Sequence, residues 1–189
     1  MPGQRPYFRP HPGRVPVRLR SIEQLRHEEV HRQPRRYPIT LLCPDWQDPR
    51  NVGSIFRLAD AAGLTEIVLA GTTPQPPHPK IARTARSTER AVPYRYIPEA
   101  LPFMQQAKRA GSQVVALEIT SESQSLFDYV PPADRPLLLV AGTERSGIAA
   151  DLLAEADLAV HLPMHGQNTS MNVAVAVGAA VYLLLMKLQ

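Results

Sequence analysis

The sequence predicts an α/β domain with a mainly parallel sheet flanked by helices. Short apolar runs rich in Leu, Val and Ile alternate with longer segments whose apolar residues recur at helical spacing. Hydrophobic residues make up 44% of the chain and aromatic ones only 6%, which suits an aliphatic core. A length of 189 residues fills one such domain but not comfortably two.

The first half of the domain starts this alternation. We expect a strand over 37–43, a helix over 51–62, a strand over 66–70, a helix over 80–87 and a strand over 91–97. Each strand is a short apolar run bounded by turn residues, and each helix has spaced apolar positions. Asp48 and Pro49 start a turn before the first helix, and four prolines make 72–79 a loop.

The second half continues in the same way. We expect a helix over 99–110, strands over 113–119 and 136–141, a helix over 149–156, a strand over 158–162 and a final helix over 170–188. Residues 173–186 are apolar nearly all round, which exceeds what contact with one sheet face requires. This pattern favours a homodimer in which the final helix is covered on its outer side as well.

A basic, proline-rich arm over 1–36 precedes the domain over 37–189. The arm holds nine arginines against three glutamates, whereas the rest of the chain has a small acidic excess. Such an arm is typical of a nucleic-acid contact; a solvated tail and a transit peptide are the alternatives, and the prolines argue against the second. Ser21 and Gln24 resemble a capping box, which predicts a short helix over 21–33.

Several classes of protein are disfavoured by the composition. Cys43 is the only cysteine and lies in an apolar run, so we expect a buried apolar group in a reducing compartment. The chain opens without a signal peptide, and its longest apolar run is too short to span a bilayer, which predicts a cytoplasmic protein. His161 and His165 are four residues apart but straddle a strand end and Pro163, so we expect no metal site.

Three polar turns follow apolar runs, at 51–57, 142–148 and 162–173. Because the carboxyl ends of parallel strands meet at one edge of a sheet, we expect side chains from these turns to converge there. The second turn is not a phosphate loop, since Ile148 stands where lysine is required, and no dinucleotide fingerprint follows any strand. The site therefore suits a small cofactor held by backbone amides and apolar side chains.

The same three segments resemble the SpoU-type (TrmH-like) RNA 2′-O-ribose methyltransferases of the SPOUT superfamily. The matching residues are Asn51, Val52, Gly53, Arg57, Ala59, Asp60, Gly63, Gly142, Thr143, Glu144, Gly147, Ile148, Pro163, Met164, Ser170, Met171, Asn172 and Val173. The resemblance covers roughly residues 37–188, and three motifs in the family's order make it specific. It implies an α/β fold with a C-terminal deep trefoil knot, S-adenosylmethionine as cofactor, and a homodimer whose site is built from both subunits.

The resemblance also implies a role for each site residue. Cofactor contacts are implied for Leu117, Ala141, Gly142, Leu162 and Met171. Catalytic roles are implied for Asn51, Arg57, Glu144, Ser170 and Asn172. Arg57 would either take the proton of the ribose hydroxyl or clamp the target phosphate; a guanidinium normally stays charged, which makes the first role awkward. Taken singly, Asn51 and Ser170 also fit helix N-caps, Arg57 a surface arginine and Glu144 a solvated turn acid.

A group of basic residues predicts the contact with RNA. Lys80, Arg83, Arg86 and Arg90 are three or four residues apart, which predicts a phosphate-contacting strip on one helix face. Arg145 lies inside the second polar turn and is expected to reach the RNA backbone as well. A solvated basic face is the alternative. Few aromatic residues lie near these cations, which favours reading of backbone and shape over reading of bases.

We therefore expect an S-adenosylmethionine-dependent methyltransferase that acts on a ribose 2′-OH of tRNA or rRNA, with no choice between the two RNAs. A catalytically inactive SPOUT-fold RNA-binding module is the alternative, which the joint presence of Asn51, Arg57, Ser170 and Asn172 disfavours. A flavodoxin-like nucleotide-binding regulator fits the α/β alternation alone. Binding of S-adenosylmethionine and methyl transfer to bulk RNA separate the three.

Overall fold

The computed structural model describes residues 24–26, 29–30, 35–143 and 145–188. The chain divides into two compact units, residues 1–33 and residues 34–189. The helix expected over 21–33 lies largely outside the described residues, as does most of the basic arm. Within the described ranges, no helix has the length and apolar character needed to cross a membrane.

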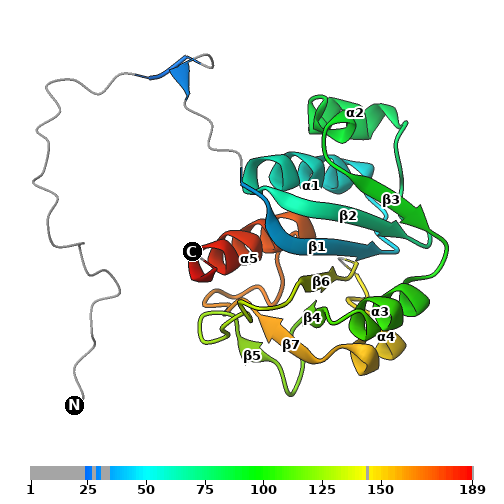
Figure 1. Ribbon diagram of the computed structural model, residues 1–189, viewed down its shortest axis with the longest axis vertical. Helices are drawn as coiled ribbons and strands as arrows, with labels where there is room; N and C mark the ends of the chain where they lie inside the picture. Colours follow the sequence, from blue (N-terminus) through cyan, green and yellow to red (C-terminus); the bar gives the residue numbers. More distant parts are fainter. Residues whose placement is uncertain (1–23, 27–28, 31–34, 144, 189) are drawn as a thin grey trace, which may run out of the picture. The chain divides into compact units, whose positions relative to one another are not determined.

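The second unit is built on a seven-stranded sheet, and every pair of neighbouring strands is parallel, as predicted (Figure 1). The strands are β1 (Tyr37–Pro44), β2 (Leu64–Ala70), β3 (Tyr94–Ile97), β4 (Gln113–Leu117), β5 (Gln124–Ser125), β6 (Leu137–Ala141) and β7 (Leu158–His161). Their order across the sheet is β3-β2-β1-β6-β4-β7-β5. The carboxyl ends of all these strands therefore lie along one edge, where ligands bind in such sheets.

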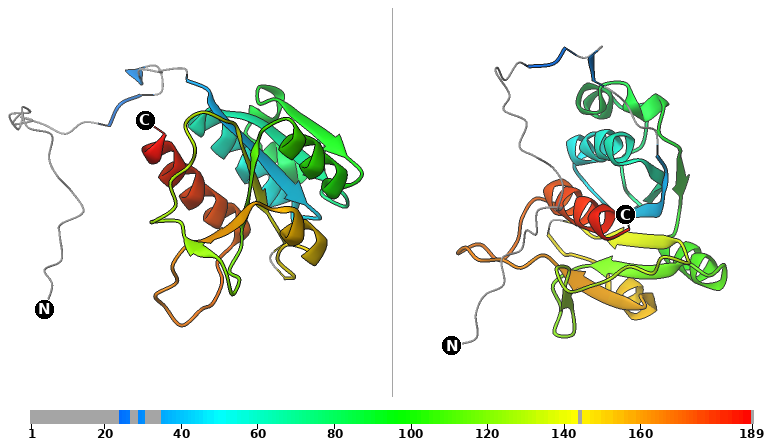
Figure 2. Two further views of the ribbon diagram at one scale, coloured as in Figure 1. Left: turned by 60° about the horizontal axis from the view of Figure 1, so that its bottom comes forward. Right: turned by 60° about the vertical axis from the view of Figure 1, so that its left-hand side comes forward.

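Helices cover both faces of the sheet (Figure 2). On one face, α1 (Pro49–Ala62) and α5 (Val173–Lys187) pack side by side, and α2 (Pro79–Ala85) packs against α1. On the other face lie α3 (Ala100–Arg109) and α4 (Ala150–Glu155).

The aliphatic side chains predicted to form the core are divided between the two faces of the sheet. Leu41 belongs to the core on the α1 and α5 face, and its neighbour Leu42 belongs to the core on the α3 and α4 face. Successive side chains of a strand point to opposite faces, so β1 is buried on both. A continuous apolar run such as 37–43 is the sequence pattern of a strand in that position.

The first helix begins at Pro49, two residues before its predicted start. Asp48 is its N-cap and accepts a hydrogen bond from the backbone N–H of Arg50 at 2.8 Å, while Pro49 needs no N–H partner at the first helical position. The predicted turn at Asp48 and Pro49 is therefore the start of α1. As a result, Asn51 lies inside the first turn of the helix and is buried.

The other elements predicted within residues 37–188 are present, with differences at their ends. β3 begins at Tyr94 rather than at residue 91, because a 3₁₀ helix (Thr88–Arg90) occupies the chain just before it. α5 begins at Val173 rather than at residue 170, because Asn172 is its N-cap. The two-residue strand β5 was not among the predictions, since Gln and Ser carry no apolar signal.

Candidate functional site

A cavity of about 300 Å³ lies at the carboxyl edge of the sheet. Residues that follow β4, β6 and β7, together with the first residues of α5, line it. Four of the five predicted cofactor contacts are among the lining residues: Leu117, Gly142, Leu162 and Met171. Charged or titratable side chains are fewer than apolar ones along the cavity and belong to Glu118, Arg145 and His161.

Ala141, the fifth predicted contact, does not line this cavity. It is buried at the end of β6, and its carbonyl accepts a hydrogen bond from the indole Nε1 of Trp46 at 2.7 Å. The backbone N–H of Trp46 donates to Thr73 Oγ1 at 3.0 Å, and Thr73 Oγ1 donates to the carbonyl of Cys43 at 2.7 Å. These bonds tie together the ends of β1, β2 and β6 beneath the site. Trp46 is thus a supporting residue that the sequence patterns did not reveal.

Cys43 is buried in the core, as expected. Burial raises the pKa of its thiol far above the ordinary range, so the thiol stays protonated near neutral pH. A buried, protonated thiol is a poor nucleophile, which agrees with Cys43 being an apolar core residue. No group of three or more His, Cys, Asp or Glu side chains suited to a metal ion occurs in the part of the chain that the structure describes.

The turn after β6 is a tight loop closed by two backbone hydrogen bonds. Thr143 N–H donates to the Gly147 carbonyl at 3.0 Å, and Gly147 N–H donates to the Thr143 carbonyl at 3.1 Å. A Cβ on Gly142 would lie 2.2 Å from backbone atoms of Gly147, so no other residue fits there without opening the loop. Gly147 itself has a φ of 65°, in the left-handed region. Glu144 lies outside the described residues.

The carboxylate of Glu118 anchors this loop from the neighbouring strand end. Its Oε2 accepts a hydrogen bond from the backbone N–H of Ile148 at 3.1 Å, and its Oε1 accepts one from the N–H of Ile119 at 2.9 Å. The sequence patterns placed Glu118 inside a strand over 113–119, which hid its function. The strand ends at Leu117, so Glu118 is free to reach across to the β6 loop.

Asn51 and Asn172, two of the predicted catalytic residues, contact each other although 121 positions separate them. Asn172 Nδ2 donates to Asn51 Oδ1 at 3.1 Å, while Asn172 Oδ1 accepts from the backbone N–H groups of Ala174 and Val175. Asn172 therefore caps α5 and at the same time holds it to the first turn of α1. The simpler reading of Asn51 as an N-cap is wrong, because Asp48 has that role, and Asn172 rather than Ser170 caps α5.

Ser170 and Arg57, the other described members of the predicted catalytic set, lie apart. Ser170 lines the cavity. The Arg57 side chain is exposed on α1, does not line the cavity, and has no hydrogen bond or ion pair with any described residue. Its neighbour Leu58 lies where α1 and α5 pack, with Cδ1 4.0 Å from the position of a Cβ on Gly178. Of the predicted catalytic set, the structure thus brings Asn51 and Asn172 into contact and places Ser170 on the cavity, whereas Arg57 does not line that cavity.

The basic strip predicted on one helix face is not formed as such. Lys80 and Arg83 lie on α2, but the helix ends at Ala85, and Arg86 adopts a left-handed conformation with a φ of 55°. Arg90 lies on the following 3₁₀ helix, with Nε 3.8 Å from Glu89 Oε1. Spacing of three or four residues places side chains on one face only while the helix continues.

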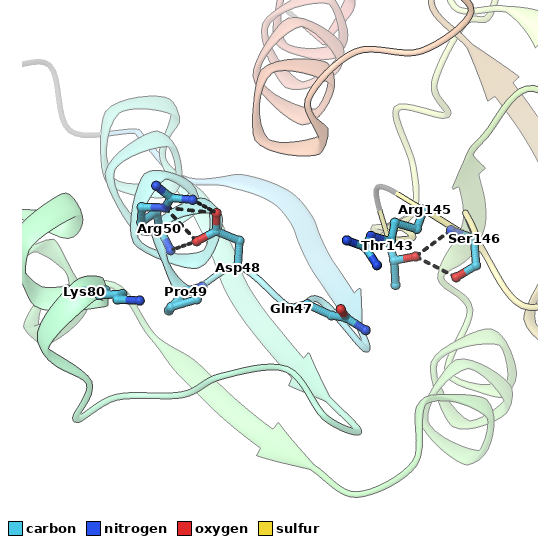
Figure 3. Close-up of a pocket in the computed structure, with 8 residues that line it drawn as sticks. All are labelled: Gln47, Asp48, Pro49, Arg50, Lys80, Thr143, Arg145 and Ser146. Carbon is cyan, nitrogen blue, oxygen red and sulfur yellow. Dashed lines mark hydrogen bonds and ion pairs between the residues drawn. The ribbon is translucent and has the colours of Figure 1, made fainter.

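A second cavity, of about 460 Å³, brings two of the predicted RNA contacts together from different elements (Figure 3). Lys80 and Arg145 line it, and Arg83, Arg86 and Arg90 do not. It also exposes Asp48 and Arg50, whose side chains form an ion pair with an Nη2 to Oδ2 distance of 2.7 Å. The hydrogen bond from Arg50 holds the pKa of the Asp48 carboxyl below its ordinary value. Thr143 and Arg145 line both cavities, so the two adjoin.

Comparisons with known proteins bear on this geometry. A model of the SpoU rRNA Methylase family matches residues 38–182. The 23S rRNA (guanosine(2553)-2'-O)-methyltransferase RlmP of Bacillus subtilis (strain 168) is 34% identical over 143 residues, which are 75% of this chain and 56% of that protein. A tRNA (guanosine(18)-2'-O)-methyltransferase of Saccharomyces cerevisiae is 30% identical over 136 residues, which are 71% of this chain and 9% of that protein.

Solved structures agree with the sequence matches. The AdoMet-bound rRNA methyltransferase from Sinorhizobium meliloti aligns with a TM-score of 0.74 at 28% identity, over 82% of this chain and 59% of that one. The SpoU methyltransferase AviRb from Streptomyces viridochromogenes, in complex with AdoMet, aligns with a TM-score of 0.69 at 26% identity, over 78% of this chain and 59% of that one. The chain spans about half the length of the first relatives it matches. The match over 38–182 shows that the chain belongs to the SpoU rRNA methylase family.

Proposed function

We propose that the protein transfers a methyl group from S-adenosylmethionine to a ribose 2′-OH of tRNA or rRNA. The observation that carries this proposal is the cavity at the ends of β4, β6 and β7, which is lined by segments that belong to the family match. Two relatives support it by name, one as a 23S rRNA and one as a tRNA 2′-O-methyltransferase. Neither name selects the RNA or the nucleotide for this chain.

The cavity suits S-adenosylmethionine in size and in chemistry. Its volume of about 300 Å³ lies in the range of small-molecule sites. Leu117, Leu162 and Met171 offer apolar surface, and Gly142 keeps the loop backbone close. When bound, S-adenosylmethionine supplies an electrophilic methyl group on a sulfonium. The protein must position the ribose oxygen in line with that methyl, help its proton leave and exclude water.

The residues around the cavity support those tasks. The Asn172 cap and its bond to Asn51 fix the start of α5 beside the cavity. Ser170 lines the cavity, and we assign it to contact the ribose. Arg57 is assigned to the RNA, either as a clamp on the target phosphate with stabilisation of the forming alkoxide, or as the group that takes the proton. Glu144 is assigned to orient polar groups of the β6 loop.

We further propose a homodimer in which Arg57 serves the cavity of the partner subunit. An apolar stripe along α5 supports it: Val175, Tyr182 and Met186 are 61%, 52% and 64% exposed, and Ala179 lies between them. Exposed apolar side chains at helical spacing mark an interaction surface. Arg57 lies on α1 beside this helix, outside the cavity of its own chain. The deep trefoil knot stays a prediction.

The central experiment measures binding and turnover separately. Titration calorimetry with S-adenosylmethionine is followed by transfer of a radiolabelled methyl group to bulk tRNA and rRNA, with mass-spectrometric mapping of 2′-O-methyl nucleotides. We expect cofactor binding and label on ribose. Cofactor binding with no transfer to either RNA would favour the inactive RNA-binding module, and affinity for nucleotides without cofactor binding would favour the flavodoxin-like regulator.

A mixing experiment tests the shared site. The Arg57→Ala variant is expected to lack the RNA-side group and Gly142→Ala to bind the cofactor weakly, so each loses most of its activity alone at limiting cofactor. Mixed subunits place one intact Arg57 beside one intact cavity, and partial activity should return. Tyr182→Glu should yield monomers in analytical ultracentrifugation. Recovery of no activity on mixing, with dimers still present, would contradict the shared site while leaving methyl transfer itself intact.

A further inference from the structure

The second cavity lies between the start of α1, the start of α2 and the β6 loop, and none of the five predicted cofactor contacts is among its described lining residues. Its lining includes three cationic side chains, Arg50, Lys80 and Arg145, and one carboxylate, Asp48. Among the described lining residues this leaves an excess of two positive charges. No aromatic side chain is among its described lining residues. The described lining therefore favours an anion and offers no stacking surface of the kind that a nucleobase requires.

The three cations reach the cavity from separate elements. Figure 3 shows Lys80 on the α2 side and Arg145 on the β6-loop side, with the segment from Gln47 to Arg50 between them. Neither Lys80 nor Arg145 has an ion pair with a described residue, and Lys80 acts on the Asp48 carboxylate only through its charge. Arg50 is held by Asp48, but the two side chains are 67% and 31% exposed. A pair that exposed contributes little stability and can exchange its partner.

We propose that this cavity binds a backbone phosphate of the RNA next to the nucleotide that is methylated. The inference rests on the proposed function and adds to it a phosphate site within one chain. Thr143 and Arg145 line both cavities, so an anion bound here lies beside the methyl donor. One guanidinium group can donate two parallel hydrogen bonds to phosphate oxygens, and the ammonium group of Lys80 adds a point charge. The site positions the RNA chain without reading its sequence.

Asp48 has a second role in this arrangement. Its carboxylate accepts hydrogen bonds from Nε and Nη2 of Arg50, at 3.0 and 2.7 Å. These are the guanidinium donors that phosphate oxygens would use. An RNA phosphate must displace it, so Asp48 lowers the affinity of the site for RNA backbone. Asp48 also caps α1, and asparagine caps a helix equally well. Asp48→Asn therefore removes the competing charge without disturbing the helix.

The test measures RNA affinity of the full chain by fluorescence anisotropy, with labelled total tRNA and a labelled single-stranded RNA, over a series of salt concentrations. Arg50→Gln and Lys80→Gln should each weaken binding about threefold at moderate salt and reduce the salt slope by about 1. Arg109→Gln is the matched control, because this exposed arginine ends α3, away from the carboxyl edge of the sheet. Calorimetry should show unchanged S-adenosylmethionine affinity for the Arg50 and Lys80 variants.

The Asp48→Asn variant is expected to give a result that misfolding could not produce. We expect it to bind both RNAs about threefold more tightly than the wild type. Removing the carboxylate that competes with phosphate raises RNA affinity, whereas losing a contact to RNA lowers it. Wild-type affinity and salt slope in the Arg50 and Lys80 variants would overturn the inference, even where the wild type methylates RNA. The inference is also wrong if these variants lose S-adenosylmethionine affinity instead. A wild type that binds RNA with these effects but transfers no methyl group would sink the proposed function alone.

Discussion

The two adjoining cavities differ in what they are made of. The first is lined largely by apolar side chains and loop backbone from the ends of β4, β6 and β7, and the second by Arg50, Lys80 and Arg145 around Asp48. They share Thr143 and Arg145 of the β6 loop. A small donor with little net charge suits the first surface, and a polyanion suits the second. One loop can therefore join a surface suited to a small molecule to a surface suited to RNA.

The largest effect is expected for Arg57, which lines neither cavity of its own chain. Arg57→Ala should lower methyl transfer by about 10²–10³-fold, because its charge is assigned to the transition state and the RNA. S-adenosylmethionine affinity should stay at the wild-type value, since Arg57 does not line that cavity. Steady-state transfer assays and calorimetry measure the two quantities. Full activity of this variant would remove Arg57 from the mechanism.

Gly142→Ala should break both cavities at once, because the loop they share must open. The added Cβ would lie 2.2 Å from Gly147 backbone atoms and 2.4 Å from the Ile148 nitrogen. A strain of about 1–3 kcal/mol corresponds to about 5- to 150-fold weaker cofactor binding by calorimetry. RNA affinity should fall as well. Gly166→Ala is the control, since its Cβ would meet nothing within 4 Å; equal behaviour of the two variants would contradict the account of the loop.

Asn172→Ala should affect the cofactor cavity alone. It removes the cap of α5 and the bond to Asn51, at a cost of about 1 kcal/mol in the free energy of unfolding, read from chemical denaturation. Asn172→Ser keeps a capping oxygen but cannot reach Asn51, so it should recover most of the stability and not the cofactor affinity. RNA affinity should change in neither variant. Recovery of both by serine would mean that the Asn51 contact has no role beyond packing.

The smallest effect concerns Asp48 and acid. Because Arg50 lowers the pKa of the Asp48 carboxyl, the pair stabilises the fold above the ordinary range of an aspartate and loses that contribution as pH falls below about 4. Asp48→Asn does not titrate, so thermal melts should show the wild type losing its advantage over the variant below that pH. A difference in Tm that does not change with pH would show that the pair contributes nothing to stability.

Much of the fold could be predicted from local patterns. The strand over 37–43 and the helix over 51–62 were recognised because an apolar run or a spaced apolar face is a property of neighbouring residues. The ends of elements were less predictable. The α1 start at Pro49 and the α2 end before Arg86 depend on caps and on a single left-handed residue, which periodicity does not report.

By itself, the sequence determined the alternation of strands and helices, the parallel sheet and the polar loops that follow β6 and β7 at its carboxyl edge, whereas the polar segment 51–57 is part of α1 rather than a turn. Only the tertiary structure decided which side chains meet there. The Asn51 to Asn172 bond, the Trp46 to Ala141 bond and the cavity that joins Arg50 to Arg145 all connect residues far apart in the chain. Such contacts depend on how strands are ordered and helices packed, and no local pattern of residues encodes that order.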